Sequence, residues 1–244
     1  RFSLLKALNR GLVPSIYFSD SPDEDLKAYA NDYLKEEIAA EGLTRNVPAF
    51  SRFLQVAALC NGLMINYTNI SNDSQVPSST VQEYFQILRD TLIGFDLPAW
   101  KKSRRRKPIS TSKFYFFDVG VVRYLQNCSQ LKKGSPEFGA AFETYLAHEL
   151  KAFLDYNNMG NLYYWRSKSG YEVDFIINDS TAIEVKAKTN ISPRDLRGIM
   201  ALKEEKKLNN YLVVSLEKRP RVISGVHILP WEDFLSQLWD DAFS

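Results

Sequence analysis

The sequence predicts a mixed α+β and α/β protein in three parts: a helical segment over residues 1–47, a winged helix-turn-helix over 48–130 and a mixed-sheet domain over 131–244. Apolar residues recur at helical spacing through much of the first two parts. Two short β-like runs around a basic stretch follow in the second part. In the third part a helix, three strand-like runs, a helix and two more runs follow one another, which is typical of an α/β core with a mixed sheet.

The segment 1–47 has the pattern of helices separated by turn residues. Leucines recur at helical spacing over residues 4–12, and Pro14 ends the run. Ser21, followed by a proline and three acidic residues, predicts a helix start, because acids are favoured in the first turn. The helix that follows carries an apolar stripe, and we expect it to end near Gly42.

The segment 48–130 has the pattern of three helices and a hairpin. Residues 48–88 carry three helix patterns, and the third opens with a Ser-Ser-Thr capping signature. The runs 92–97 and 113–117 are rich in β-forming residues. Between them, residues 101–107 hold six basic side chains in seven positions. Three helices and a hairpin with a basic tip predict a winged helix-turn-helix.

A loop near Pro136 precedes the third part, and a helix starts near Phe138. Strands are predicted wherever short apolar runs are bounded by turn residues, and helices where the period changes to 3.6. The expected elements in order are strands at 162–166, 171–177 and 181–187, a helix at 193–207, strands at 211–215 and 226–229, and a helix at 231–239.

Two carboxylates and an amine in the third part indicate a phosphodiester-cleaving site. Glu184 and Lys186 stand two residues apart on one expected strand and therefore share a face, and Asp174 stands on the strand before it. Mg²⁺ takes one or two carboxylates with water and phosphate oxygens. We expect Asp174 and Glu184 to hold Mg²⁺ or Mn²⁺, and Lys186 to orient water or offset charge. Glu143, an acid among apolar residues of the preceding helix, is expected to assist as a third ligand. The alternative is an ion cluster at the sheet edge, with Glu143 as an ordinary surface acid.

These residues resemble the PD-(D/E)XK motif of restriction endonucleases and archaeal Holliday junction resolvases. The whole chain resembles the C-terminal part of a prokaryotic AAA-type ATPase family, whose last domain has a restriction-endonuclease-like fold. The segments that carry the resemblance are 11–17 and 29–38 for an ATPase lid, 48–54 and 113–120 for a winged helix, and 170–175 with 183–186 for the nuclease-like core.

The resemblance implies that residues 1–47 are a helical lid remnant. The family's P-loop domain has no counterpart in the sequence, so ATP would bind only to that missing N-terminal domain, which would be a partner in the full protein. No ATPase activity is expected from this chain. It lacks an initiator Met and begins as if inside a helix, so we expect it to be a piece of something longer.

DNA is the expected partner, and three groups of residues are candidates to contact it. Each has a structural alternative: a basic loop also prevents edge pairing, a polar helix start also caps the helix, and basic residues in a turn are also merely solvated. The candidates are Lys101, Lys102, Arg104, Arg105, Arg106 and Lys107 in the wing, Ser79, Thr80 and Gln82 at a helix start, and Arg166 and Lys168 before the motif strand.

The bulk composition excludes several other classes. A net charge of +2 gives no general affinity for nucleic acid, so local basic clusters have to provide it. Two cysteines and two histidines give no pattern of a disulfide framework, a zinc site or a catalytic triad. No apolar run approaches the length of a membrane span and no signal peptide is present, so a cytoplasmic protein without membrane contact is expected. A homo-oligomer stays open.

The leading hypothesis from the sequence is DNA binding by the middle part and Mg²⁺-dependent cleavage by the last. The first alternative is a non-catalytic regulator that binds DNA or a partner while the missing ATPase domain does the work. The second is an assembly module with no affinity for nucleic acid.

Overall fold

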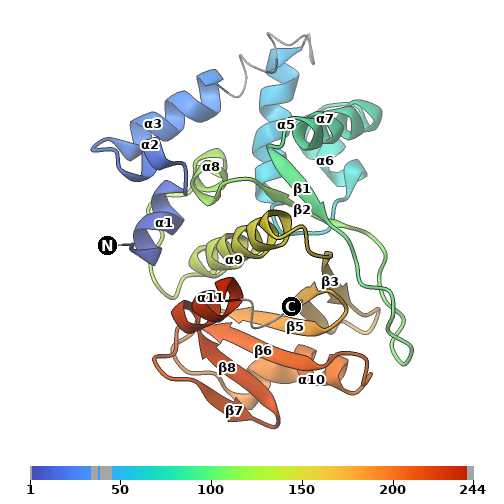
Figure 1. The fold of residues 1–244 in the computed structure, drawn as a ribbon. Helices are drawn as coiled ribbons and strands as arrows, with labels where there is room; N and C mark the ends of the chain where they lie inside the picture. The colour runs from blue at the N-terminus through green and yellow to red at the C-terminus, as the bar shows by residue number, and fades with distance from the viewer. Residues whose placement is uncertain (1, 34–37, 39–45, 241–244) are drawn as a thin grey trace. The chain divides into compact units, whose positions relative to one another are not determined.

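The structure, a computed structural model, describes residues 2–33, 38 and 46–240 (Figure 1). The helix end expected near Gly42 lies outside these residues. None of the described helices is both long and apolar enough to cross a membrane.

The chain divides into two compact units. The first unit comprises Arg1–Asp96 and Phe114–Tyr145, and the second comprises Leu97–Lys113 and Leu146–Ser244. The basic segment that the sequence suggested as a wing tip is therefore part of the unit that contains the large sheet. The division does not coincide with the three expected parts, which stay a prediction.

The first unit is mainly helical, and its only described strands belong to a two-stranded sheet. Its elements are α1 (Leu4–Arg10), α2 (Pro14–Tyr17), α3 (Pro22–Ala28), the π-helix η1 (Tyr29–Tyr33), α5 (Val47–Leu59), α6 (Tyr67–Ser74), α7 (Ser78–Asp90), β1 (Gly94–Leu97), β2 (Lys113–Phe116), α8 (Val119–Leu125) and the start of α9 (Pro136–Tyr156).

Aromatic side chains form the core of the first unit. The ring of Phe85 lies edge-on to Phe53 at 5.0 Å and to Phe114 at 4.9 Å between centroids, which joins α5, α7 and β2. Helix α7 buries Val81, Tyr84, Phe85 and Leu88, the stripe that its 3.6-residue period predicts. Its N-cap is Pro77, and no side chain caps it, so the expected Ser-Ser-Thr cap does not form. Three helices followed by a two-stranded sheet are present.

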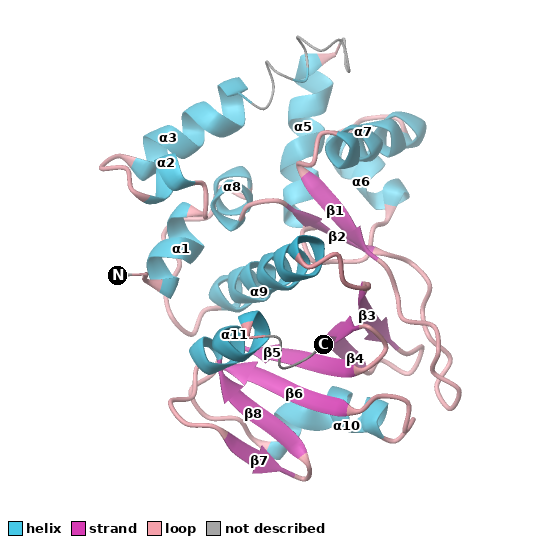
Figure 2. Ribbon diagram, viewed as in Figure 1, coloured by secondary structure: helices cyan, strands magenta, loops and turns pink. Residues whose placement is uncertain are grey.

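The second unit is built on a six-stranded mixed sheet in the order β3-β4-β5-β6-β8-β7. β5, β6 and β8 run parallel, and the other neighbours are antiparallel. Helices α10 and α11 lie on opposite faces of this sheet (Figures 1 and 2). The elements are β3 (Leu162–Arg166), β4 (Glu172–Ile177), β5 (Thr181–Lys186), the 3-10 helix η2 (Pro193–Leu196), α10 (Arg197–Lys203), β6 (Asn210–Ser215), β7 (Arg221–Ile223), β8 (Val226–Pro230) and α11 (Trp231–Trp239).

One core of the second unit lies under α10. Ile199 and Leu202 of that helix pack with Trp165, Val173 and other strand residues, all of them buried. The continuation of α9 past residue 145 contacts α11, where the rings of Phe153 and Trp239 meet edge-on at 5.6 Å. The sheet is thus covered by helices on both sides, as its apolar strands require.

Candidate functional site

A tight turn sets up the hairpin that carries the predicted site. Asn178, Asp179 and Ser180 join β4 to β5, and the first two have φ angles of 51° and 57°. The Ser180 N–H donates to the Ile177 carbonyl at 2.9 Å, which closes the turn. Asn and Asp tolerate the left-handed conformation better than most residues, so this pair favours a tight hairpin turn, here a three-residue loop between the paired Ile177 and Thr181. The turn in turn fixes the register of the two strands.

The register brings the two predicted carboxylates to neighbouring positions. Phe175 pairs with Ile183 across the hairpin. One step further in the same register, Asp174 would stand opposite Glu184, and residues opposite one another share a face. Both are buried, at 8% and 6% exposure.

A β-bulge on the other side of β4 falls at Asp174. Trp165 of β3 pairs with Val173, and Tyr163 pairs with Ile176, so two β4 residues face one β3 residue between these pairs. Val173 and Ile176 accordingly belong to the same core cluster, which strict alternation would forbid. Bulges redirect side chains and are frequent beside active sites.

The Asp174 carboxylate is held by the neighbouring strand. Its Oδ2 accepts a hydrogen bond from the Val185 N–H at 2.7 Å. Asp174 is therefore oriented by the backbone of β5.

A cleft of about 530 Å³ opens beside the ends of β4 and β5. Acidic and basic side chains share its lining, and its polar walls suit an ionic ligand better than an apolar one. The lining residues are Ser169, Gly170, Tyr171, Glu172, Glu184, Lys186, Arg194, Asp195, Arg197 and Gly198.

Glu184 and Lys186 form an ion pair in this cleft. The Lys186 Nζ lies 2.5 Å from Glu184 Oε1, and the side chains are 28% and 8% exposed for the lysine and the glutamate. The spacing of two residues that predicted a shared face is confirmed. Because the ammonium is partly open to the cleft, it can also donate to a ligand there.

Glu172, which shares the strand of Asp174, is engaged by two cations. One oxygen lies 2.7 Å from the Lys113 Nζ and the other 3.1 Å from Arg166 Nη1. Lys113 is almost fully buried, so this carboxylate compensates a buried charge. Glu172 therefore has a structural role, and Arg166, a predicted DNA contact, is one of its ion-pair partners.

Arg194 and Arg197 add positive charge to the cleft wall. Both are exposed, and among the described residues neither forms an ion pair. The neighbouring Asp195 pairs instead with Lys188 at 2.5 Å and accepts from the Ser192 N–H at 2.9 Å. Two guanidinium groups spaced three residues apart are suited to bind phosphate oxygens.

Glu143 is placed in the first unit, whereas the other three predicted site residues are in the second. Its Oε1 accepts a hydrogen bond from the Tyr115 hydroxyl at 2.6 Å. Within the described residues, no three His, Cys, Asp or Glu side chains are grouped to hold a metal ion. Joint metal binding by Glu143, Asp174 and Glu184 stays a prediction.

The predicted DNA contacts of the basic segment divide into two kinds. Lys102 pairs with Asp179 at 2.7 Å, and Arg106 pairs with Glu204 at 2.6 Å. The others are exposed and make no ion pair within the described part of the chain: Lys101, Arg104, Arg105, Lys107 and, after β3, Lys168.

The predicted contacts on α7 lie at its exposed start. Ser79 and Gln82 are exposed and Thr80 is half-buried, while the apolar stripe of the same helix faces the core. The helix therefore presents polar groups outward, as a groove-binding helix does and as an ordinary surface helix also does.

The sequence reasoning missed the two arginines and the turn that positions them. A signal existed: Arg194 and Arg197 stand three residues apart at a helix start, where i,i+3 side chains are neighbours. What could not be foreseen is that this helix start lies beside the first residue of β4, where a Cβ added to Gly198 would lie 2.0 Å from the Glu172 carbonyl oxygen.

Two family models match the chain. Residues 1–132 match a domain of unknown function (DUF8612). Residues 138–234 match a second domain of unknown function (DUF4143), which is found at the C-terminus of AAA-ATPase-like proteins. Neither the curated proteins nor the solved structures compared with the chain contain a match.

Proposed function

We propose that this chain, which belongs to the DUF8612 family, binds DNA in the β4–β5 cleft of its second unit and cleaves phosphodiester bonds there. The observation that carries the proposal is the joint lining of one cleft by Glu184, Lys186, Arg194 and Arg197. A phosphodiester brings negative charge to the cleft and gains more when a nucleophile attacks it, so cations that are already positioned stabilise that charge.

The donor set fits a hard divalent cation. Asp174 and Glu184, on adjacent strands, would hold Mg²⁺ or Mn²⁺, which takes one or two carboxylates with water and phosphate oxygens. When bound, the ion would neutralise phosphate charge and make a bound water more acidic.

The protein's own side chains account for binding and orientation. The Lys186 ammonium, held by Glu184 at 2.5 Å, is positioned to donate to a water or a phosphate oxygen. Arg194 and Arg197 are suited to hold flanking phosphates. The bond from the Val185 N–H keeps the Asp174 carboxylate in place.

The first unit is proposed to contribute a winged helix. Helices α5, α6 and α7 followed by the pair β1–β2 have the order of that motif, and Ser79 and Gln82 are exposed on α7. The match to DUF4143 supports action together with an AAA-type ATPase domain, which would be the ATP-binding partner in the cytoplasm.

A non-catalytic binding module is the second candidate. One observation favours it: the described residues contain no group of three His, Cys, Asp or Glu side chains that could hold a metal ion. Proteins do bind Mg²⁺ through only two carboxylates, so this observation does not decide the matter. In that case the cleft would bind DNA, and activity would lie in the ATPase domain.

A cleavage assay decides between the two. Duplex and branched DNA would be incubated with the wild-type chain and Mg²⁺ or Mn²⁺, beside Asp174→Asn, Lys186→Ala and the control Lys218→Ala. We expect cleavage to fall at least about 100-fold in the first two variants and to persist in the control, because Lys218 is exposed and lies outside the cleft lining. Equal cleavage in all four would refute the site. Metal-independent DNA binding without cleavage would instead support the binding module.

A further inference from the structure

One buried carboxylate fixes the shape of the basic segment 101–107. Glu205 Oε2 accepts from the backbone N–H groups of Arg104 and Arg105, both at 2.9 Å, and its Oε1 accepts from Arg106 N–H at 3.1 Å. The Glu205 side chain is only 1% exposed. Burial opposes its charged form, but the backbone donors outweigh this effect and hold its pKa below the ordinary value. The segment is therefore an organised turn with a carboxylate at its centre.

Both ends of this segment are bonded to the edge of the large sheet. Before it, Trp100 N–H donates to the Tyr164 carbonyl at 2.7 Å. After it, Ile109 N–H donates to the Arg166 carbonyl at 2.8 Å, and the Lys107 carbonyl accepts from Lys168 N–H at 2.9 Å. A loop that served only solubility would not need so many fixed contacts. The backbone presents its basic side chains in a defined arrangement.

A cavity of about 440 Å³ lies against this turn. Asp179 is the only acid in its described lining, and its oxygens already accept from Trp100 Nε1 at 2.6 Å and from Lys102 Nζ at 2.7 Å. The remaining basic residues in the lining, Lys101, Arg104 and Lys207, are exposed, and within the described residues they make no ion pair. The cavity thus has a surplus of positive charge, which suits an anion.

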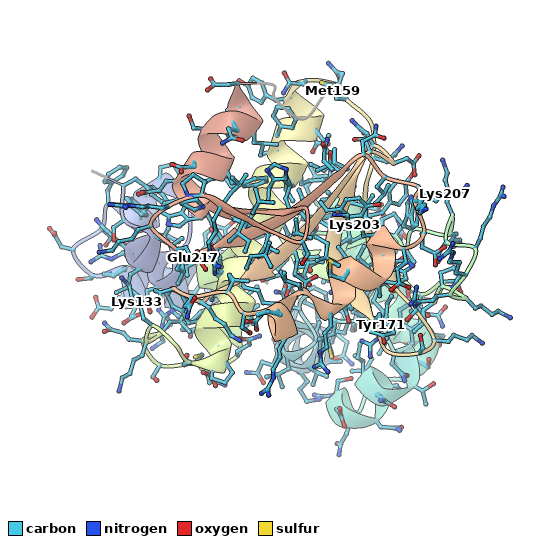
Figure 3. The ribbon with its side chains drawn as sticks, turned by 90° about the horizontal axis from the view of Figure 1, so that it is seen from below. Lys133, Met159, Tyr171, Lys203, Lys207 and Glu217 are labelled. Atoms are coloured by element: carbon cyan, nitrogen blue, oxygen red, sulfur yellow. The ribbon has the colours of Figure 1, made fainter. Side chains whose placement is uncertain are left out.

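The turn continues from this cavity to the β4–β5 cleft. The Arg106 guanidinium lies 5.2 Å from the centroid of the Tyr171 ring, and Tyr171 lines the cleft. The Lys107 carbonyl accepts a hydrogen bond from the N–H of Lys168, which precedes the cleft residue Ser169. Figure 3 shows Lys207 and Tyr171 toward the same side of the second unit, with Glu217 toward the other. The cavity and the cleft are therefore connected by the basic segment 101–107. Two positively charged spaces connected in this way suit a polymer that carries many phosphates better than a single small anion.

We propose that Lys101, Arg104 and Lys207 bind a backbone phosphate of the nucleic-acid strand that enters the β4–β5 cleft. The choice of nucleic acid as the polymer rests on the proposed function. The binding itself requires neither cleavage nor a metal. Glu205 is a positioning residue, because it touches no ligand and holds the backbone of Arg104.

The first test measures DNA binding with the metal removed. Labelled duplex and single-stranded DNA of one sequence would be titrated with the wild-type chain, with the triple variant Lys101→Ala, Arg104→Ala, Lys207→Ala, and with a control of equal charge change, Lys132→Ala, Lys133→Ala, Lys218→Ala. All six residues are exposed. We expect at least about a tenfold loss of affinity in the first triple, and a slope of log K against log salt that is smaller by about 1, as one lost phosphate contact predicts.

The control triple should bind within about twofold of the wild type. Equal losses in the two triples would overturn the proposal, because net charge alone would then explain binding. An unchanged affinity in the first triple would also overturn it. Wild-type binding without cleavage would sink the nuclease function and leave the phosphate site standing, so the two failures are distinguishable.

The second test uses Glu205→Gln, which removes a negative charge. If charge alone decided binding, this variant would bind DNA as well as or better than the wild type. If Glu205 positions Arg104, affinity for DNA should fall about threefold or more. Both carboxylate oxygens of Glu205 accept from the backbone, whereas the NH₂ group of a glutamine can only donate, so one backbone donor at least would lose its acceptor. Tryptophan fluorescence would verify that the second unit, which holds all four tryptophans, stays folded. Binding that improves in this variant would refute the positioning role.

Discussion

Two buried acidic sites, one in each unit, use their charges differently. In the first unit, Asp118 is 1% exposed and accepts from three backbone N–H groups, those of Leu12 at 2.6 Å, Gly120 at 2.9 Å and Val121 at 3.0 Å. In the second unit, Glu184 lies against a cleft and is paired with the side chain of Lys186. Glu184 lines the cleft of about 530 Å³, and Asp118 is not among the residues of that lining.

The difference separates a structural charge from one that we propose to be functional. Backbone donors around Asp118 cap the start of α8 and tie it to the chain after α1, so exchanging them for a ligand would require local unfolding. A side-chain partner beside a cleft can turn toward a ligand at the price of a rotamer change. Burial alone therefore does not indicate function; the kind of partner and the presence of open space do.

The largest expected effect comes from removing the structural charge. Asp118→Ala leaves three backbone N–H groups of the first unit without their acceptor, and we expect a loss of about 3 to 5 kcal/mol in the free energy of unfolding. Far-ultraviolet circular dichroism follows both units, and tryptophan fluorescence follows only the second, where all four tryptophans lie. The shift should be larger in the dichroism signal.

Asp73→Ala is the matched control for this prediction, because Asp73 is an exposed acid on α6 of the same unit. It should change stability by less than about 0.5 kcal/mol. If Asp118→Ala were as mild as the control, the contrast between the two acidic sites would not hold.

Much of the second unit followed from sequence because its strands carry local signals. The run 162–166 is β3, and the closing helix 231–239 is α11, as apolar period and length predicted. β7, at Arg221–Ile223, was missed, because three largely exposed residues have no apolar alternation. The helix expected over 193–207 ends at Lys203, and Lys206 takes a φ of 53°, which no pattern of apolar residues announces.

The candidate site followed from sequence only where it is local. The shared face of Glu184 and Lys186 depends on the two-residue period of a strand, which a sequence displays. The contact of Glu205 with the backbone of Arg104 joins residues 101 positions apart. Such a pairing depends on tertiary packing, and for that reason the basic segment looked like a free wing tip.

The wall of the cleft offers a test of smaller effect. Gly198 of α10 approaches β4 so closely that an added Cβ would lie 2.0 Å from the Glu172 carbonyl oxygen. Gly198→Ala should push the helix from the strand and reduce the stability of the second unit by about 2 kcal/mol, read by tryptophan fluorescence during chemical unfolding.

Gly139→Ala is the control for that substitution, since nothing lies within 4 Å of a Cβ at this helical position. It should be neutral or stabilise the first unit, in which it lies, by up to about 1 kcal/mol, because alanine favours helix. This control is read by far-ultraviolet circular dichroism, which follows both units. A Gly198→Ala variant as stable as the wild type would show that α10 can move away from β4 at little cost in stability. The cleft wall that α10 forms would then not be rigid.

The smallest expected effect concerns Asp195, an acidic residue of the cleft lining whose carboxylate accepts hydrogen bonds from Lys188 and Ser192. Burial raises its pKa, but the Lys188 ammonium and the hydrogen bonds from Ser192 outweigh this and lower the pKa from 3.8 to about 2. A carboxyl with a depressed folded-state pKa contributes stability above 3.8 that is lost as the pH falls through about 2. Because Lys188 is 56% exposed and solvent screens the pair, we expect only about 1 kcal/mol.

Asp195→Asn isolates this contribution, because the amide keeps the shape and does not titrate. Chemical unfolding would be followed by tryptophan fluorescence at about pH 5 and about pH 2.5 for both proteins. The wild type should lose about 1 kcal/mol more than the variant between these conditions, since other carboxyls titrate equally in both. Equal losses would mean that Lys188 does not hold Asp195 in solution. Asp195 would then be able to compete with DNA phosphate for Arg194 and Arg197. It would have to be counted as a charge available to ligands, like Glu184, and not as a structural charge, like Asp118.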